Sequence, residues 1–213
     1  MAQSDTVDRI LDAAEVLFAE RGFSETSLRM ITSKAKVNLA AVNYHFGSKN
    51  ALIQAVFSRF LSPFSSNLEN ELKRVSEKHA GNPIDIETLM GLVITCIIKV
   101  PTQSKTGVSV FMRLLGLAYT QSQGHLRKYL EQEYSRAFKL FMKHVREATP
   151  ELSPVDRFWR IQFMLGTTAF TMSSIEALSG ILENEMHVNS STEEVVRRLV
   201  PFLAAGLQAP LHK

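Results

Sequence analysis

The stretch TSLRMITSKAKVNLAAVNYHFGSK, residues 26–49, decides the fold of this chain. Apolar residues recur three or four positions apart on both sides of a break at residues 36–38, and this pattern predicts two short helices joined by a tight turn. The second helix is expected from about Leu39 to Phe46, with Asn38 as its N-cap. Two helices joined by about three residues form the smallest unit that places one helix in the major groove of DNA.

Charge supports this interpretation. From Thr26 to Leu68 the chain contains no Asp or Glu, whereas five cationic residues occur there, namely Arg29, Lys34, Lys36, Lys49 and Arg59. An unopposed positive charge suits a surface that approaches phosphate. The alternative is an ordinary helix pair whose lysines are simply solvated.

The expected contacts with DNA follow from the second helix. If Val42 and Phe46 anchor it, Asn43 is placed to bond adenine, and Tyr44 and His45 can reach phosphates or base edges. A single histidine is more commonly a structural hydrogen-bonding group. The candidate DNA-binding residues are Thr26, Ser27, Arg29, Asn38, Leu39, Ala40, Ala41, Asn43, Tyr44, His45 and Lys49.

Helical periodicity continues through the rest of the 213 residues, which predicts an all-α protein of about nine helices. Ser48 is expected to cap a longer helix that bends or breaks near Pro63. Breaks rich in Gly, Pro, Ser or Asn bound further helices at about 85–100, 107–120, 124–148, 154–182 and 192–208. We expect a DNA-binding domain at residues 1–50 and a larger domain at residues 51–213.

Composition narrows the class of protein. Cys96 is the only cysteine, so no intramolecular disulfide can form, and its apolar surroundings indicate a buried side chain. The N-terminus lacks the pattern of a signal peptide, and no apolar run reaches the roughly 20 residues of a membrane span. We therefore expect a cytoplasmic protein that needs no cofactor or metal.

The segments ILDAAEVLFAERGFSETSLRMI and VNLAAVNYHFGSKNALI resemble the N-terminal domain of TetR-family transcriptional regulators, and the element from Tyr44 to Lys49 is specific in this context. The resemblance implies a homodimer with a DNA-binding head and a body that binds a small effector. Two residues depart from the family pattern. An aromatic residue is frequent where Asn43 stands, and glycine is frequent at Lys36, where a positive φ would strain a lysine by about 1 kcal/mol.

Two segments of the body, FMRLLGLAYTQSQGHLRKYL and FWRIQFMLGTTAFTMS, resemble the fatty-acid-responsive regulators of the PsrA group. This implies a long-chain fatty acid or acyl-CoA as effector, and control of lipid degradation or stationary-phase genes. Another hydrophobic effector, such as a drug or an aromatic compound, is the alternative.

A binding site for a hydrophobic effector is expected in the body. The 107–120 segment is apolar on nearly every face, which indicates a buried helix, and Arg113 interrupts it. Arg113 would then pair with an acid such as Glu131 or Glu176, or bind an effector carboxylate or phosphate. The candidate effector residues, each of which plain core packing also explains, are Met90, Ile97, Phe111, Arg113, Leu115, Tyr119, Phe138, Phe141, Met142, Phe163 and Met164.

Small and apolar residues on the last two expected helices suit a four-helix dimer interface. Packing within one chain is the alternative. The candidate interface residues are Gly166, Ala169, Ser173, Ala177, Val196, Leu199, Val200 and Leu203.

Together these patterns favour a dimeric, ligand-responsive regulator, mainly a repressor, that binds a palindromic operator. An enzyme such as an acyl hydrolase is disfavoured, because the chain lacks a G-x-S-x-G elbow, a Gly-rich phosphate loop and metal-ligand spacing among its six histidines. A helical lipid-binding protein with a basic head is a distant alternative.

Overall fold

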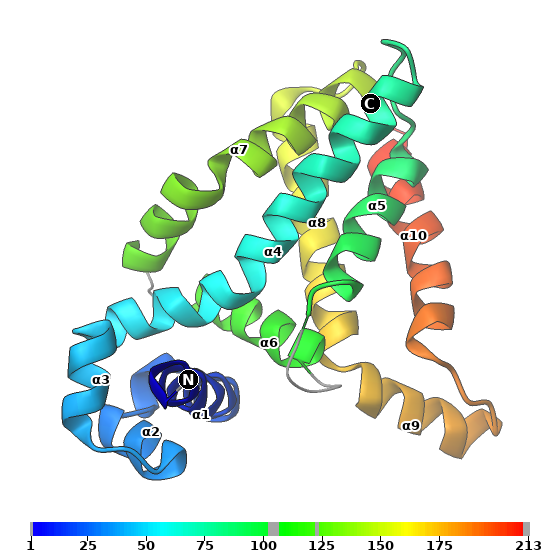
Figure 1. Cartoon of the computed structure of the whole chain (residues 1–213). Helices are drawn as coiled ribbons and strands as arrows, with labels where there is room; N and C mark the ends of the chain where they lie inside the picture. The colour runs from blue at the N-terminus through cyan, green and yellow to red at the C-terminus, as the bar shows by residue number, and fades with distance from the viewer. Residues whose placement is uncertain (1, 102–106, 122–123, 211–213) are drawn as a thin grey trace. The chain divides into compact units, whose positions relative to one another are not determined.

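A computed structural model describes residues 2–101, 107–121 and 124–210 (Figure 1). Those residues contain ten α-helices and no strand, which confirms the all-α prediction. The helices are α1 (Ala2–Glu25), α2 (Leu28–Ala35), α3 (Leu39–Phe46), α4 (Lys49–Lys78), α5 (Ile86–Ile98), α6 (Gly107–Thr120), α7 (Gly124–Ala148), α8 (Pro154–Ser173), α9 (Ile175–Met186) and α10 (Thr192–Gln208).

Two details differ from the sequence expectation. The helix expected at 154–182 is divided at Ser174, whose φ of −112° and ψ of 11° interrupt the regular geometry. The neighbouring Ser173 hydroxyl donates to the Phe170 carbonyl, the kind of local bond with which serine competes against the helical ladder. Conversely, α4 continues through Pro63, so the helix is not broken there, and the alternative of a bend stays a prediction.

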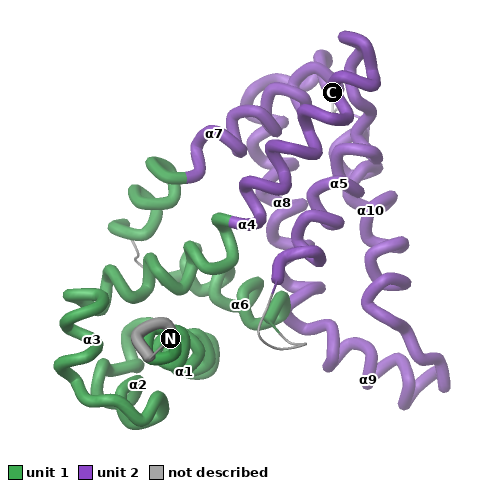
Figure 2. The backbone as a smooth tube through the Cα atoms, viewed as in Figure 1, with its two compact units in different colours: residues 1–62, 102–133 green, residues 63–101, 134–213 purple. Residues whose placement is uncertain are grey.

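The chain forms two compact units (Figure 2). Unit 1 comprises residues 1–62 and 102–133, and unit 2 comprises residues 63–101 and 134–213. Helices α4 and α7 therefore contribute to both units. This division does not coincide with the expected boundary at residue 50, and the functional division of the chain stays a prediction.

Unit 1 is built on a chain of aromatic contacts between α1, α4 and α6. The ring of Phe23 lies 5.4 Å from Phe18 and 6.2 Å from Phe57, measured between centroids. Phe111 of α6 stacks on Phe60 at 3.8 Å and meets Phe57 edge-on at 5.7 Å. Aromatic pairs of this kind add to the stability gained by burial. Helices α2 and α3 pack on α1, so the DNA-binding candidates lie on a firm support.

Unit 2 has its core where α5 and α8 pack against α10. A buried arginine stabilises one corner. Arg157 donates to the Thr149 carbonyl at 2.6 Å, the Thr149 hydroxyl at 3.1 Å and the Leu152 carbonyl at 2.7 Å. Backbone carbonyls thus provide the acceptors that a buried guanidinium requires. Among the described helices, none is both long enough and apolar enough for a membrane span.

Candidate DNA-binding interface

The entry into α2 depends on Thr26 and Ser27, which have opposite orientations. The Ser27 hydroxyl accepts from the Met30 N–H at 3.2 Å and caps α2. Thr26 is fully buried, and its hydroxyl donates to the carbonyls of Leu17 at 3.0 Å and Gly22 at 2.8 Å. The prediction that Thr26 contacts DNA is therefore wrong for its side chain, which faces the core.

The turn between α2 and α3 has a left-handed residue at its centre. Lys36 has φ 54° and ψ 47°, the conformation in which glycine is usually found. The Lys36 N–H donates to Ser33 at 3.3 Å, and the Val37 N–H donates to the Thr32 carbonyl at 3.0 Å. These bonds satisfy carbonyls that the end of α2 leaves free.

Arg9 of α1 completes this turn. Its Nη2 donates to the carbonyl of Ala35 at 2.6 Å and to the carbonyl of Lys36 at 2.8 Å. The guanidinium also places a positive charge at the C-terminus of α2, where the helix dipole favours it. Sequence reasoning did not identify Arg9, because a charged residue on the first helix gives no sign of a partner 27 positions away.

Helix α3 has one buried face and one polar face. Asn38 caps it as predicted, accepting from the Ala41 N–H at 2.8 Å. Val42 is fully buried and Phe46 is half-buried, so the helix is anchored from that side. The opposite side presents Asn43 and Tyr44, and Tyr44 is 77% exposed. Leu39 and Ala40 are also exposed, whereas Ala41 and His45 are half-buried.

The cations of this segment divide into two groups. Arg29, Lys34 and Lys36 are exposed on α2 and the turn, whereas Lys49 is half-buried and donates to the Ser24 carbonyl over 3.4 Å. Arg59 instead lies against three acids of α1, with Asp12 at 2.5 Å, Glu15 at 3.7 Å and Asp8 at 3.8 Å. The interpretation of Arg59 as a charge facing phosphate is therefore wrong.

The predicted effector residues fall into both compact units. Phe111, Arg113, Leu115 and Tyr119 belong to unit 1, and the others belong to unit 2. Met90, Ile97 and Phe111 are buried, whereas Leu115, Phe141, Met142 and Met164 are half-buried. The side chains of Tyr119, Phe138 and Phe163 are between 60% and 65% exposed, so the structure does not support an enclosed tunnel around them.

Arg113 differs from its prediction. Its side chain is exposed, so the expectation of a buried charge is wrong. An exposed guanidinium is solvated by water and does not require an acidic partner. The apolar run around it is buried on the sides that carry Phe111, Met112 and Leu114. Arginine on a largely apolar helix therefore marks the solvent side here.

Unit 2 contains a hollow of about 580 Å³ between α4 and α5, and none of its lining residues is a predicted effector residue. Polar side chains such as Asn67, Glu71 and Lys99 surround it, and Glu71 pairs with Arg74. Cys96 also lines it but is only 2% exposed, and burial raises the pKa of its thiol. Its prediction as a buried side chain is confirmed, and a protonated thiol is a poor nucleophile.

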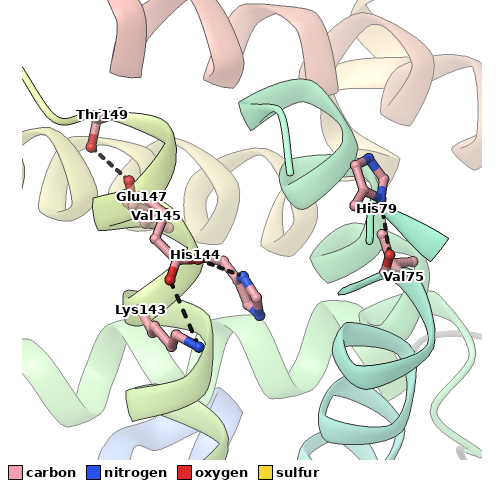
Figure 3. Close-up of polar contacts among 7 residues, drawn as sticks. All are labelled: Val75, His79, Lys143, His144, Val145, Glu147 and Thr149. Carbon is pink, nitrogen blue, oxygen red and sulfur yellow. Dashed lines mark hydrogen bonds and ion pairs between the residues drawn. The ribbon is translucent and has the colours of Figure 1, made fainter. Parts of the chain in front are cut away.

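Figure 3 shows another polar group of unit 2 that sequence reasoning missed. His144 of α7 is 3% exposed, and its Nδ1 lies 3.1 Å from Oε2 of Glu147, which also pairs with Lys143 at 3.7 Å. The His144 Nε2 is buried without a hydrogen-bond partner among the described residues. A buried polar atom of this kind is a place where water or a ligand can bind.

The predicted dimer residues also separate into two groups. Leu199 and Leu203 are buried inside unit 2, so assigning them to an interface is wrong. Val200 is half-buried, and its side chain lies near Gly91 of α5, so Val200 also faces the interior of unit 2. The remaining candidates, Gly166, Ala169, Ser173, Ala177 and Val196, are exposed or half-buried.

Large apolar side chains of α8, among them the predicted effector residue Phe163, are exposed. Val155, Trp159, Phe163 and Phe170 recur along α8 at helical spacing, and each is more than half exposed. Phe202 of α10 is 65% exposed. Exposed large apolar side chains that gather on one helix commonly mark an interaction site.

Comparison with known proteins agrees with the geometry of α2 and α3. Residues 10–56 match the family described as "Bacterial regulatory proteins, tetR family". Residues 93–206, more than half of the chain, match the family described as "Tetracyclin repressor-like, C-terminal domain". The chain belongs to the TetR family of transcriptional regulators. The expectation of a regulator rather than an enzyme agrees with this membership.

Named relatives match over about a third of their length. The chain is 38% identical over 71 residues to the probable HTH-type transcriptional regulator YttP of Bacillus subtilis, covering 33% of this chain and 34% of that protein. It is 37% identical over 68 residues to the regulator UidR of Escherichia coli, covering 30% and 35%. The chain thus spans about a third of the length of these relatives.

Solved structures share the fold over nearly the whole chain. A TetR-like transcriptional regulator from Rhodococcus has a TM-score of 0.61 at 17% identity, covering 96% of this chain and 97% of that one. The fatty acid degradation regulator FadR from Bacillus halodurans has a TM-score of 0.61 at 16% identity, covering 98% and 97%. SmeT, the repressor of a multidrug efflux pump of Stenotrophomonas maltophilia, has a TM-score of 0.58 at 19% identity, covering 96% and 91%. At these identities the likeness concerns the fold alone.

Proposed function

We propose that this protein is a dimeric, ligand-responsive transcriptional regulator, mainly a repressor, that binds a palindromic operator through α2 and α3. The observation that carries the proposal is the arrangement of α3. On one face of α3 the side chain of Val42 is fully buried, while Asn43 and Tyr44 are exposed to solvent. A helix of eight residues is about 12 Å long, close to the width of the major groove.

The proposed contacts with DNA are of two kinds: contacts with phosphates, which position the protein, and contacts with base edges, which recognise the sequence. Exposed Arg29, Lys34 and Lys36 are suited to phosphates, and the free N–H groups at the start of α3 favour an anion. Asn43 can bond the N6 and N7 atoms of adenine, and exposed Ala40 can contact a thymine methyl group. Two copies of this head on a twofold axis would read two half-sites.

A selection from random DNA followed by fluorescence anisotropy tests this proposal. Tyr44→Ala and Lys34→Ala are expected to weaken binding to the selected sequence without loss of helicity, because both side chains are exposed on the head. Lys73→Ala removes an exposed cation of unit 2 and is the matched control. Equal affinities for the wild type and both variants would remove α2 and α3 from the mechanism.

Dimerisation is proposed through α8 and α10. The exposed stripe of Val155, Trp159, Phe163 and Phe170 lies on α8, which packs against α10 with its exposed Phe202. Small or half-buried neighbours such as Gly166 and Ala169 permit a second helix to approach closely. Burial of these side chains by a second copy would remove a large apolar surface from water.

We further propose a long-chain fatty acid or acyl-CoA as the effector. The resemblance of the body segments to the PsrA group supports this choice, as does the shared fold with the fatty acid degradation regulator FadR. The comparable fold match to SmeT keeps a drug or an aromatic compound as the alternative. An effector can release DNA only by its different affinity for the two states, and a coupling of about 1–3 kcal/mol changes operator affinity about 5- to 150-fold.

Mass spectrometry of lipids that co-purify with the protein, followed by anisotropy with oleate, oleoyl-CoA and an aromatic dye, tests the effector. Release of operator by the acyl compounds alone supports the proposal. Release by the dye alone favours the alternative. Binding of DNA that none of the three compounds changes would overturn the fatty-acid assignment and leave the DNA-binding proposal intact.

A further inference from the structure

Helix α1 loses its regular geometry shortly before the DNA-binding candidates. Gly22 has φ 84° and ψ 168°, far from helical values, although α1 extends to Glu25. The Phe23 side chain is 1% exposed. Because a break in a helix leaves backbone groups without helical partners, a buried N–H at this point needs an acceptor from elsewhere.

Gln121 supplies that acceptor from a position 98 residues further along the chain. Its Oε1 accepts from the Phe23 N–H at 3.2 Å. Gln121 follows α6 directly, and its own N–H donates to the Leu117 carbonyl at 2.9 Å. Both partners belong to unit 1, and α1 packs extensively against α6.

The same amide group lies close to the backbone of Gly22, so a side chain at position 22 would require the Gln121 amide to move. A Cβ atom built on Gly22 would lie 2.7 Å from Nε2 of Gln121, closer than real Cβ atoms approach a neighbour. The positive φ of Gly22 independently favours glycine. The lack of a Cβ atom at Gly22 therefore leaves room for the Gln121 amide, and the positive φ of Gly22 also favours glycine at this position.

The break determines where α2 begins. The Gly22 carbonyl accepts from the Thr26 hydroxyl at 2.8 Å, and Ser27, the next residue, caps α2. On the other side, the Phe23 ring packs on Phe57 of α4. A shift of the backbone at residues 22–23 would thus move the first turn of α2, and with it α3.

We infer that Gln121 is a positioning residue for DNA binding, one that acts through the backbone of Phe23 and the start of α2. The inference rests on the proposed function of α2 and α3. It assigns to Gln121 no contact with DNA. Its effect on operator affinity comes from the orientation of the two helices and not from charge.

The test compares Gln121→Met, which keeps the size of the side chain but removes the acceptor, with Gln121→Glu, which keeps an acceptor oxygen. Tyr129→Phe is the matched control, because it removes the 2.7 Å bond between the hydroxyls of Ser58 and Tyr129 in the same unit. Operator affinity is measured by anisotropy, and opening of residues 22–31 is measured by hydrogen exchange. Gln121→Ala serves as a second variant where Gln121→Met is poorly folded.

Gln121→Met is expected to bind operator about tenfold more weakly, with faster exchange at residues 22–31. Its dependence on salt should be unchanged, because no phosphate contact is lost. Gln121→Glu and Tyr129→Phe should remain within about twofold of the wild type by the same reasoning. Wild-type affinity of Gln121→Met, or an equal loss in Tyr129→Phe, would overturn the inference. A wild-type protein that binds no selected DNA would overturn the proposed function itself.

Discussion

Arg9 of α1 donates from Nη2 to the carbonyl oxygen of Lys36 at 2.8 Å, and thereby holds a left-handed lysine in the turn between α2 and α3. The left-handed conformation costs a non-glycine residue about 1–2 kcal/mol. Hydrogen bonds from a charged donor contribute about 1.5–3 kcal/mol where they are well shielded, and less where the pair is exposed. The two effects are therefore of similar size.

Arg9→Met should destabilise unit 1 by about 1 kcal/mol, because the Ala35 and Lys36 carbonyls lose a charged donor that is partly exposed. We also expect weaker operator binding, since the turn sets the position of α3. Chemical denaturation and anisotropy measure the two effects. Arg9→Lys keeps the charge but lacks the guanidinium fork, so its recovery of stability should be incomplete. Equal stability of Arg9→Met and wild type would contradict this role.

Lys36→Gly should have opposite effects on stability and on DNA binding. Glycine accepts φ 54° without strain, so thermal stability should rise by about 0.5–1 kcal/mol. Loss of the exposed ammonium should weaken binding to all DNA sequences alike and reduce the slope of log K against log salt by about 1. Lys34→Gly, in the last turn of α2, is the contrasting variant and should lose stability. An unchanged salt slope in Lys36→Gly would show that Lys36 contacts no phosphate.

Asn43→Ala tests base reading. If its exposed amide bonds adenine, discrimination at one base pair of each half-site should fall by about 1–3 kcal/mol, while affinity for unrelated DNA stays nearly constant. Competition binding against operators that carry each base at every position measures this. A uniform loss over all positions would instead assign Asn43 to the phosphate backbone.

Glu15 gives a prediction for pH. Burial raises the pKa of its carboxyl above the usual 4.5, and the attraction of Arg59 opposes this only in part. The folded state therefore binds the proton more tightly than the unfolded state, and ionised Glu15 opposes folding at neutral pH. Glu15→Gln should be slightly more stable than wild type at pH 7, and the difference should shrink as pH falls through the raised pKa towards 4.5. A difference that grows on acidification would contradict this assignment of the shift.

Phe163→Ala addresses the proposed dimer. This side chain is 65% exposed in the single chain, so its truncation should weaken self-association in sedimentation experiments with little loss of helicity. Leu203→Ala is the internal comparison: Leu203 is 3% exposed, and its loss should lower the stability of unit 2 by about 2–5 kcal/mol. Wild-type association of Phe163→Ala would exclude the stripe on α8 as the contact surface.

Local signals in the sequence predicted the elements of the head correctly. Asn38 and Ser48 were identified as caps, and both accept the expected backbone N–H groups. Such capping bonds join residues three positions apart, so a short stretch of sequence contains both partners. Thr26 and Ser27 show the limit of this approach, because adjacent hydroxyl side chains look alike in the sequence and only the packing of α1 separates them.

Long-range partners were beyond the reach of sequence patterns. The buried arginine is Arg157, satisfied by carbonyls of the corner before α8, whereas Arg113 in an apolar run is exposed. Whether a charged side chain is buried or exposed depends on which carbonyls or acids tertiary packing brings near it. The same holds for Arg59, whose acidic partners on α1 lie more than 40 positions away in the chain.

The pairing of Arg59 with the acids of α1 bears on how quickly the protein finds DNA. Asp8, Asp12 and Glu15 surround Arg59 where α1 meets α4, so Arg59 does not add to the positive charge that Arg29, Lys34 and Lys36 expose on α2 and its turn. No acid within residues 26–68 offsets these three cations, so they should attract an approaching duplex before any contact forms. Added salt should then lower the association rate constant by shortening the range of that attraction.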